Sequence, residues 1–238
     1  MRPHSTTLAG PALAVLATLA LCAAPAAADV VAYWDFNSLT GAPGTANVLQ
    51  ADQGAGSIFL DGTNGSSFWA STASNPHLTA LTGLSENALP GVAAGMALVL
   101  ANSSPAVNGS SNGFSMVITV SLANWQSVAV SYATRGSGSG AGFSSQAWSY
   151  STDGINFTSL VTVSGTNAGT TSVVDLGALS MLDNAPMAYL RVTFNGATAT
   201  NGHNRIDNFL VTGTAVPAPG AAALLAMAGM AAASRRRR

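Results

Sequence analysis

The chain has 238 residues, of which 7% are charged and 48% are hydrophobic, and its formal net charge is −1. All eight basic residues are arginine, and five of them lie in the terminal segments 1–28 and 215–238. The body between these segments carries three arginines against nine acidic residues, a net charge of −6. Nucleic acids bind proteins through clustered Lys and Arg, so this balance excludes nucleic acid as an expected partner.

Residues 1–28 have the three-part layout of a secretory signal peptide. Arg2 precedes an apolar stretch at 8–21, and the segment ends in small residues up to Ala28. We therefore expect signal peptidase to cleave between Ala28 and Asp29. A permanent anchor is the alternative, but fourteen apolar residues are short for the ~30 Å hydrocarbon core of a bilayer.

The only cysteine of the chain, Cys22, allows a second alternative, a lipid-anchored protein. A lipidated cysteine should follow a small residue, and here it follows Leu21. If cleavage occurs after Ala28, the mature chain has no cysteine, and it then has neither a disulfide nor a thiolate metal ligand.

Residues 29–214 read as one all-β domain, an antiparallel β-sandwich. Short stretches in which polar and apolar residues alternate are typical of half-buried strands, and they recur along the body. Long separations between candidate pairs favour jelly-roll connections. We expect strands at 30–37, 113–121, 127–134, 188–196 and 205–213, and a hairpin over 146–163 that turns at Asp153-Gly154.

Two parts of the body are less regular. Residues 38–112 are rich in Gly, Asn and Ser, and the sequence leaves the strand order there open. Within them, Leu78, Leu81 and Leu84 have helical spacing, which predicts one or two helical turns. The stretch 135–142 reads as a flexible loop between strands.

The chain ends in a second three-part segment, 215–238. An extended Pro-containing motif is followed by an apolar run at 221–233, which is long enough for a short helix, and then by an arginine cluster. The positive-inside bias keeps the arginines cytoplasmic and leaves the body outside. A plain stop-transfer sequence is the alternative. The residues of the motif and cluster are Val216, Pro217, Ala218, Pro219, Gly220, Arg235, Arg236, Arg237 and Arg238.

This tail resembles the PEP-CTERM sorting signal of exported bacterial proteins, in which a Pro-Glu-Pro motif precedes an apolar helix and an arginine cluster. The resemblance covers residues 216–238, with Ala218 in place of the family's Glu. It implies transient retention in the inner membrane by the C-terminal helix and processing by an exosortase-type membrane protease. The final location would be the cell surface or the extracellular matrix.

The second half of the body resembles β-sandwich modules of exported bacterial proteins. The stretches that carry the resemblance are "SVAVSYATRGSG" at 127–138, "WSYSTDGINF" at 148–157, "YLRVTFNGAT" at 189–198 and "NRIDNFLVTG" at 204–213. The resemblance implies a jelly-roll-like module of the kind found in carbohydrate-binding domains, and it implies no catalytic activity.

No catalytic motif is apparent. Glycoside hydrolysis uses two carboxyl groups, but Glu86 is the only glutamate and no spacing pairs the aspartates. The Gly-rich stretch at 136–140 has Gly138 where a serine nucleophile should stand. Only His77 and His203 remain in the body, too few for a zinc site.

Asp207 is the candidate metal ligand, because it lies in an apolar strand where a carboxylate is disfavoured. The simpler interpretation is that it faces solvent or pairs with Arg205 or Arg191. The alternative is a structural calcium bound by Asp207 and by Asp35 of the first strand. The resemblance to carbohydrate-binding jelly rolls favours calcium, since several carry one between their first and last strands.

Six aromatic residues could stack on sugar rings or fill the core, and core packing is favoured for each. We expect a non-catalytic surface or matrix protein that binds exopolysaccharide, and no cofactor beyond the calcium. A secreted hydrolase using Asp residues and a purely structural coat or adhesive protein are the alternatives. The six aromatic residues are Trp34, Trp69, Trp125, Trp148, Tyr132 and Tyr150.

Overall fold

The computed structural model describes residues 28–39, 48–61, 71–72, 75–76, 78–102, 110–138, 140–165 and 171–216. Nearly all of the predicted signal peptide and of the predicted sorting signal lies outside these ranges, so both stay predictions. Within the described ranges, no helix is long and apolar enough to cross a membrane.

The described chain is built from β-strands, with a single 3-10 turn, η1, at Ser180–Leu182. This confirms the all-β class. The strands are β1 (Asp29–Trp34), β2 (Val48–Gln50), β3 (Gln53–Gly54), β4 (Gly56–Asp61), β5 (Ser71–Thr72), β6 (Asn75–Pro76), β7 (Leu78–Thr82), β8 (Met96–Ala101), β9 (Ser115–Val120), β10 (Trp125–Gly136), β11 (Ser145–Ser151), β12 (Thr158–Ser164), β13 (Thr171–Ala178), β14 (Ala188–Asn195) and β15 (His203–Ala215).

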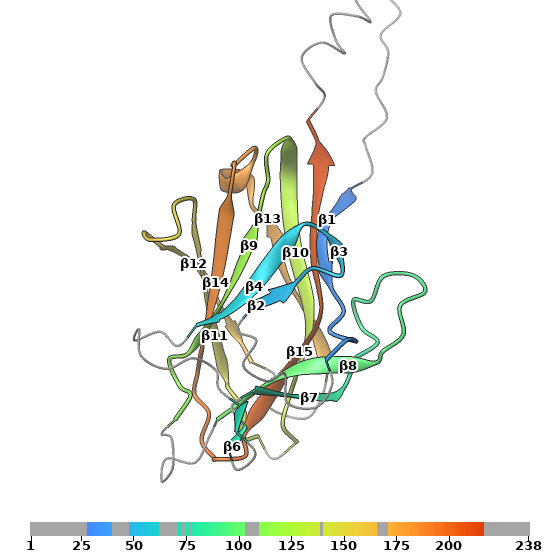
Figure 1. The fold of residues 1–238 in the computed structure, drawn as a ribbon. Helices are drawn as coiled ribbons and strands as arrows, with labels where there is room; N and C mark the ends of the chain where they lie inside the picture. Colours follow the sequence, from blue (N-terminus) through green and yellow to red (C-terminus); the bar gives the residue numbers. More distant parts are fainter. Residues whose placement is uncertain are drawn as a thin grey trace, which may run out of the picture.

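Two antiparallel sheets form the sandwich (Figure 1). The six-stranded sheet has the order β12-β11-β14-β9-β4-β2. The seven-stranded sheet has the order β13-β10-β15-β1-β3. Strand β8 pairs with the first half of β15, on the edge whose second half pairs with β1, and β7 pairs with β8. In its second half the chain passes between the sheets from β9 to β10, β10 to β11, β12 to β13, β13 to β14 and β14 to β15, as in Greek-key and jelly-roll sandwiches. The first and last described strands, β1 and β15, lie side by side.

The alternation seen in the sequence explains how the two sheets face each other. In β9 and the residue before it, Phe114, Met116, Ile118 and Val120 are all buried, whereas Thr119 is half-exposed. β10 likewise turns its alternate apolar residues inward. Period-two alternation therefore predicted both the strands and their buried faces.

Two local predictions need correction. Residues 78–82 form strand β7, which pairs with β8 over five positions, so the helical turns predicted for the leucines there are wrong. The hairpin over 146–163 is confirmed, but its connection spans residues 152–157 rather than the Asp-Gly pair alone. Asp153 accepts hydrogen bonds from the backbone N–H groups of Ile155 and Asn156, both at 2.8 Å, and these bonds shape the longer loop.

The core is centred on the ring of Phe209 in β15. Its centroid lies 5.7 Å from those of Trp34 and Tyr132 and 6.2 Å from that of Trp148. Tyr132 also connects the sheets through polar groups, because its hydroxyl donates to Gln146 and accepts from the Trp148 indole. Each buried polar atom of this cluster thus has a partner, as burial requires.

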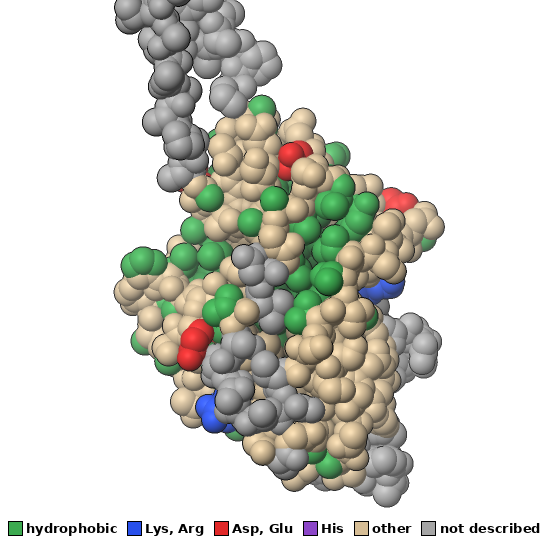
Figure 2. Space-filling view, turned by 180° about the vertical axis from the view of Figure 1, so that it is seen from behind, with side chains coloured by type: hydrophobic (Ala, Val, Ile, Leu, Met, Phe, Trp, Pro, Cys, Tyr) green, Lys and Arg blue, Asp and Glu red, His purple; other side chains and the backbone are tan. Residues whose placement is uncertain are grey.

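Charged side chains are sparse on the face drawn in Figure 2, while hydrophobic side chains gather near its centre. Among the described residues, the exposed large hydrophobic side chains include Ile155 at 81%, Val173 at 47% and Val161 at 44%.

Candidate functional site

Asp207 lies on β15 and is 0% exposed, so the prediction that it faces solvent is wrong. Its Oδ2 accepts from the Leu84 N–H at 2.6 Å, and its Oδ1 accepts from the Asn208 N–H at 2.8 Å. Arg205, predicted as a partner, donates instead to the Thr82 carbonyl oxygen at 2.9 Å. Backbone amides therefore satisfy this carboxyl group.

Burial raises the pKa of Asp207 to about 7, because the charged form loses its hydration. The two N–H donors lower the pKa, whereas the negative charges of Asp35 and Glu86 raise it further. Gly83 lets the loop backbone approach closely, since a Cβ there would lie 2.8 Å from Asp207 Oδ2. Asp207 thus holds the loop that follows β7 against β15.

The neighbouring Asn208 fixes the same loop from a left-handed backbone, with φ 48°. Its Nδ2 donates to the carbonyl oxygens of Leu84 at 2.7 Å and Glu86 at 2.9 Å. Its Oδ1 accepts from the Tyr33 hydroxyl at 2.6 Å. Burial raises the pKa of Tyr33 to about 12, so this hydroxyl stays a donor.

Asp35 follows β1 rather than lying in it, which corrects the predicted strand 30–37. Its Oδ1 accepts from the Asn37 N–H at 2.9 Å, and its own N–H donates to Asp52 Oδ2 at 2.8 Å. Burial, with the nearby Asp35, raises the pKa of Asp52. The negative charge of Asp35 raises the pKa of Asp207, so a cation bound between the two carboxylates would relieve their repulsion.

No group of three or more His, Cys, Asp or Glu side chains suited to a metal ion occurs within the described ranges. A calcium at Asp35 and Asp207 would therefore take its remaining ligands from amide and backbone oxygens. His203 is half-exposed, with Nδ1 3.1 Å from the Asn201 carbonyl oxygen, whereas His77 lies outside the described residues. The calcium site stays a prediction, to be tested by chelation.

Most of the six aromatic residues belong to the core. Trp34, Trp148 and Tyr132 are at most 2% exposed and cannot stack on a ligand in this conformation. Trp125 and Tyr150 are half-buried and pack against the core. Trp69 lies outside the described residues. Core packing is therefore confirmed for the described aromatics.

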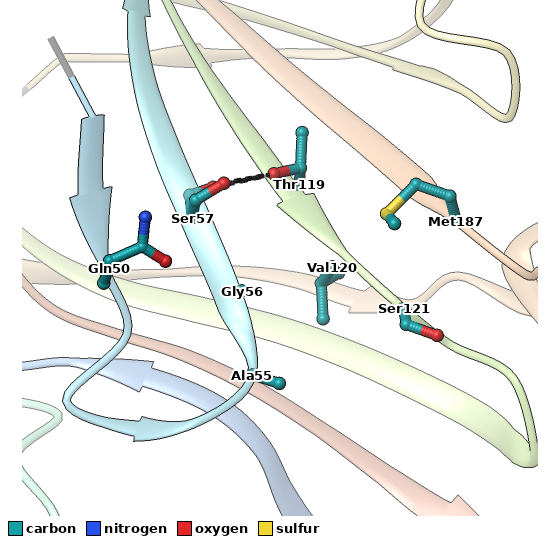
Figure 3. Close-up of a pocket in the computed structure, with 8 residues that line it drawn as sticks. All are labelled: Gln50, Ala55, Gly56, Ser57, Thr119, Val120, Ser121 and Met187. Carbon is teal, nitrogen blue, oxygen red and sulfur yellow. Dashed lines mark hydrogen bonds between the residues drawn. The ribbon is translucent and has the colours of Figure 1, made fainter.

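A pocket of about 270 Å³ opens on the solvent side of the six-stranded sheet (Figure 3). Sequence reasoning missed it, because its residues form no motif. Ser57 of β4 and Thr119 of β9 lie opposite each other, with their hydroxyl oxygens 2.6 Å apart. The lining residues are Gln50, Ala55, Gly56, Ser57, Thr119, Val120, Ser121 and Met187.

The outer face of the six-stranded sheet continues from this pocket across β14. Tyr189 pairs in register with Thr119, and Arg191 follows two residues later on the same side of the strand. The hairpin loop 152–157 borders this face, since a Cβ on Gly154 would lie 3.1 Å from the Tyr189 ring. The Arg191 guanidinium stacks over the ring of Phe157, 3.8 Å from its centroid.

No protein-family model and no curated protein matches the chain. Among solved structures, it resembles TmCBM61 in complex with β-1,4-galactotriose at 16% identity and TM-score 0.37, covering 57% of this chain and 81% of that one. The K1 cleaved adhesin domain of Lys-gingipain from Porphyromonas gingivalis W83 matches at 14% identity and TM-score 0.41, covering 78% and 98%.

The N-terminal CBM22-1-CBM22-2 tandem domain of Paenibacillus barcinonensis Xyn10C matches at 11% identity and TM-score 0.45, covering 83% of this chain and 50% of that one. At these scores the likeness is too weak to assign a ligand or an activity to this chain.

Proposed function

We propose that this protein is an exported, non-catalytic surface or matrix protein that binds extracellular polysaccharide on the outer face of the six-stranded sheet. The observation that carries the proposal is the pocket at the end of this face. Its side chains come from neighbouring strands, and Tyr189 adjoins it through Thr119.

The chemistry of the pocket suits a neutral sugar ring. Ser57, Thr119 and Ser121 offer hydroxyl groups, and Gln50 offers an amide, so both donors and acceptors are present. Met187, 38% exposed, supplies an apolar wall for the C–H surface of a sugar. A few polar groups beside apolar surface are what a small-ligand site needs for orientation and affinity.

The same arrangement disfavours the hydrolase alternative. None of the described residues that line the pocket is acidic. Asp207, whose raised pKa would suit a general acid, is fully buried with both oxygens bound to backbone amides. A glycosidase acid must reach the scissile oxygen of its substrate, so Asp207 is unsuited to that role. A purely structural coat protein differs from our proposal in binding no polysaccharide.

Export rests on the two terminal segments of the sequence. Signal peptidase would release the body at Asp29, and an exosortase-type protease would remove the arginine tail. We expect the intact mass of protein from its native host to match a chain that begins at Asp29 and lacks Arg235–Arg238. A mass that retains the four arginines would contradict the processing.

Thr119→Val tests the binding face. It removes one hydroxyl while keeping side-chain volume, and loss of a neutral hydrogen bond corresponds to roughly three- to tenfold weaker binding. We expect that loss in affinity electrophoresis of the full-length protein through galactan, xylan and polygalacturonate. Thr212→Val, on the other sheet, is the matched control. Wild-type retention on none of the three would contradict the proposed function, and unchanged retention of Thr119→Val would place binding elsewhere.

A further inference from the structure

The outer face that we assign to polysaccharide binding carries one feature that a neutral sugar does not require. Arg191 projects from the middle of β14, between Val117 of β9 and Ser149 of β11. Among the described strands of the six-stranded sheet, it is the one basic residue. A positive charge therefore stands in the middle of a sheet whose described strands carry one other charged residue, Asp61 at the end of β4.

The Arg191 guanidinium forms no hydrogen bond with the described residues of the protein. None of its nitrogens has a hydrogen-bond acceptor among the described residues, and its buried Nε is left without a partner. The acidic residue of the adjoining loop, Asp153, uses its carboxylate on Ser151, Ile155 and Asn156 instead. These contacts hold the pKa of Asp153 well below its usual range. The Asp153 carboxylate therefore forms its hydrogen bonds within the loop and not with Arg191.

Phe157 fixes the plane of this guanidinium. The centroid distance of 3.8 Å is that of a close cation–π stack, which covers one face of the planar group. An arginine held in this way has lost much of its rotamer freedom before a ligand arrives, and its geometry matches a carboxylate. The arrangement is that of a preorganised anion-binding group.

We propose that the ligand is an acidic polysaccharide and that Arg191, held on Phe157, binds the carboxylate of a uronic acid residue. This inference rests on the proposed function and extends its site. Tyr189 lies between Arg191 and the pocket on the same side of β14, and residues two apart along a strand are ~7 Å apart. One sugar chain laid along β14 can therefore reach the pocket and the arginine together.

The negative net charge of the body opposes nonspecific binding of an acidic polysaccharide. At −6, the body repels a polyanion, so general electrostatic attraction to the body would not produce binding, and attraction to the terminal arginines would be the same for polygalacturonate and poly-L-glutamate. Recognition of a uronate must come from the local contact at Arg191. Polygalacturonate and its methyl ester share a backbone and differ in charge, so they isolate this contact.

We expect affinity electrophoresis of the full-length protein to show at least tenfold tighter binding to polygalacturonate than to its methyl ester. Arg191→Gln should abolish this preference, and Arg191→Lys should restore only part of it, because lysine keeps the charge but not the planar fork. Phe157→Leu should weaken the preference by releasing the guanidinium. Arg205→Gln, on the other sheet, is the matched control and should keep it.

Equal binding of the acid and its ester by the wild type, or an unchanged preference in Arg191→Gln, would overturn the inference while leaving polysaccharide binding intact. Equal retention by poly-L-glutamate and polygalacturonate would indicate plain anion exchange and would also overturn it. Absence of binding to every polysaccharide would contradict the proposed function itself. If Arg191→Gln fails to fold, as judged by its thermal melt, Arg191→Lys and Phe157→Leu decide the question.

Discussion

Phe209→Ala is expected to lower the free energy of unfolding by about 4 kcal/mol, the loss typical of a buried phenylalanine truncated to alanine. The Phe209 ring is 0% exposed and contacts the rings of Trp34, Tyr132 and Trp148 from both sheets. Removing it leaves a cavity between rigid aromatic neighbours that cannot collapse into the space. Urea unfolding followed by tryptophan fluorescence measures the loss.

The matched control is Ile155→Ala at the tip of the hairpin loop. Ile155 is 81% exposed, so its truncation should change the free energy of unfolding by less than about 0.5 kcal/mol. A loss below about 1 kcal/mol for Phe209→Ala would contradict its place at the centre of the core. An unchanged slope of free energy against urea would show that the variant still unfolds as one unit.

The sequence predicted the strands that have one buried and one solvent-facing side. β14 alternates strictly, and Met116, Ile118 and Val120 of β9 face inward as the pattern indicates, although Ser115 on the opposite side of β9 is buried as well. β8 was missed, because "MALVLA" is apolar throughout and its four central residues are buried, so no alternation marks it. β7 was misread because three leucines happen to have helical spacing, whereas pairing with β8 decides its conformation.

In the candidate sites, too, the sequence indicated some residues, whereas their long-range contacts could not be predicted from it. Asp207 could be singled out from its own strand, since a carboxylate among apolar residues is unusual. Its partner Leu84 is 123 residues away in sequence, so neither the burial nor the loop contact could be predicted locally. The stack of Arg191 on Phe157 depends likewise on the register of β11 and β14. The pocket consists of small polar residues that carry no spacing signal.

The second large effect concerns Asp207, and we expect the stability of the protein without calcium to fall as the pH rises from about 4 to about 7. The unfolded carboxyl group has a pKa of about 4, whereas burial raises the folded pKa to about 7. Between these values the folded state binds more protons, so the free energy of unfolding decreases with pH. The difference is on the order of 4 kcal/mol.

Two other groups near this carboxyl group, Asp52 and Tyr33, also have a raised pKa. The pKa of Asp52 is raised by burial, so it adds to the fall in stability. Tyr33 keeps its proton throughout, since its pKa is about 12. Asp207→Asn should flatten the pH dependence, and Asp183→Asn, at an exposed site, should leave it unchanged. At pH 5 Asp207→Asn should also be less stable than wild type, because its NH₂ group would face a backbone N–H.

Calcium, predicted at Asp35 and Asp207, would reverse this trend, because it neutralises the carboxylates in the folded state alone. An ion that binds only the folded state raises stability by mass action, and it binds the ionised carboxyl groups. We therefore expect a chelator to lower the melting temperature at pH 8 but much less at pH 5, where Asp207 is protonated. Asp207→Asn and Asp35→Asn should each remove the sensitivity at pH 8. If the chelator changes nothing at pH 8, the calcium prediction is wrong. The fall in stability between pH 4 and pH 7 would then remain as the consequence of burying Asp207 without a cation.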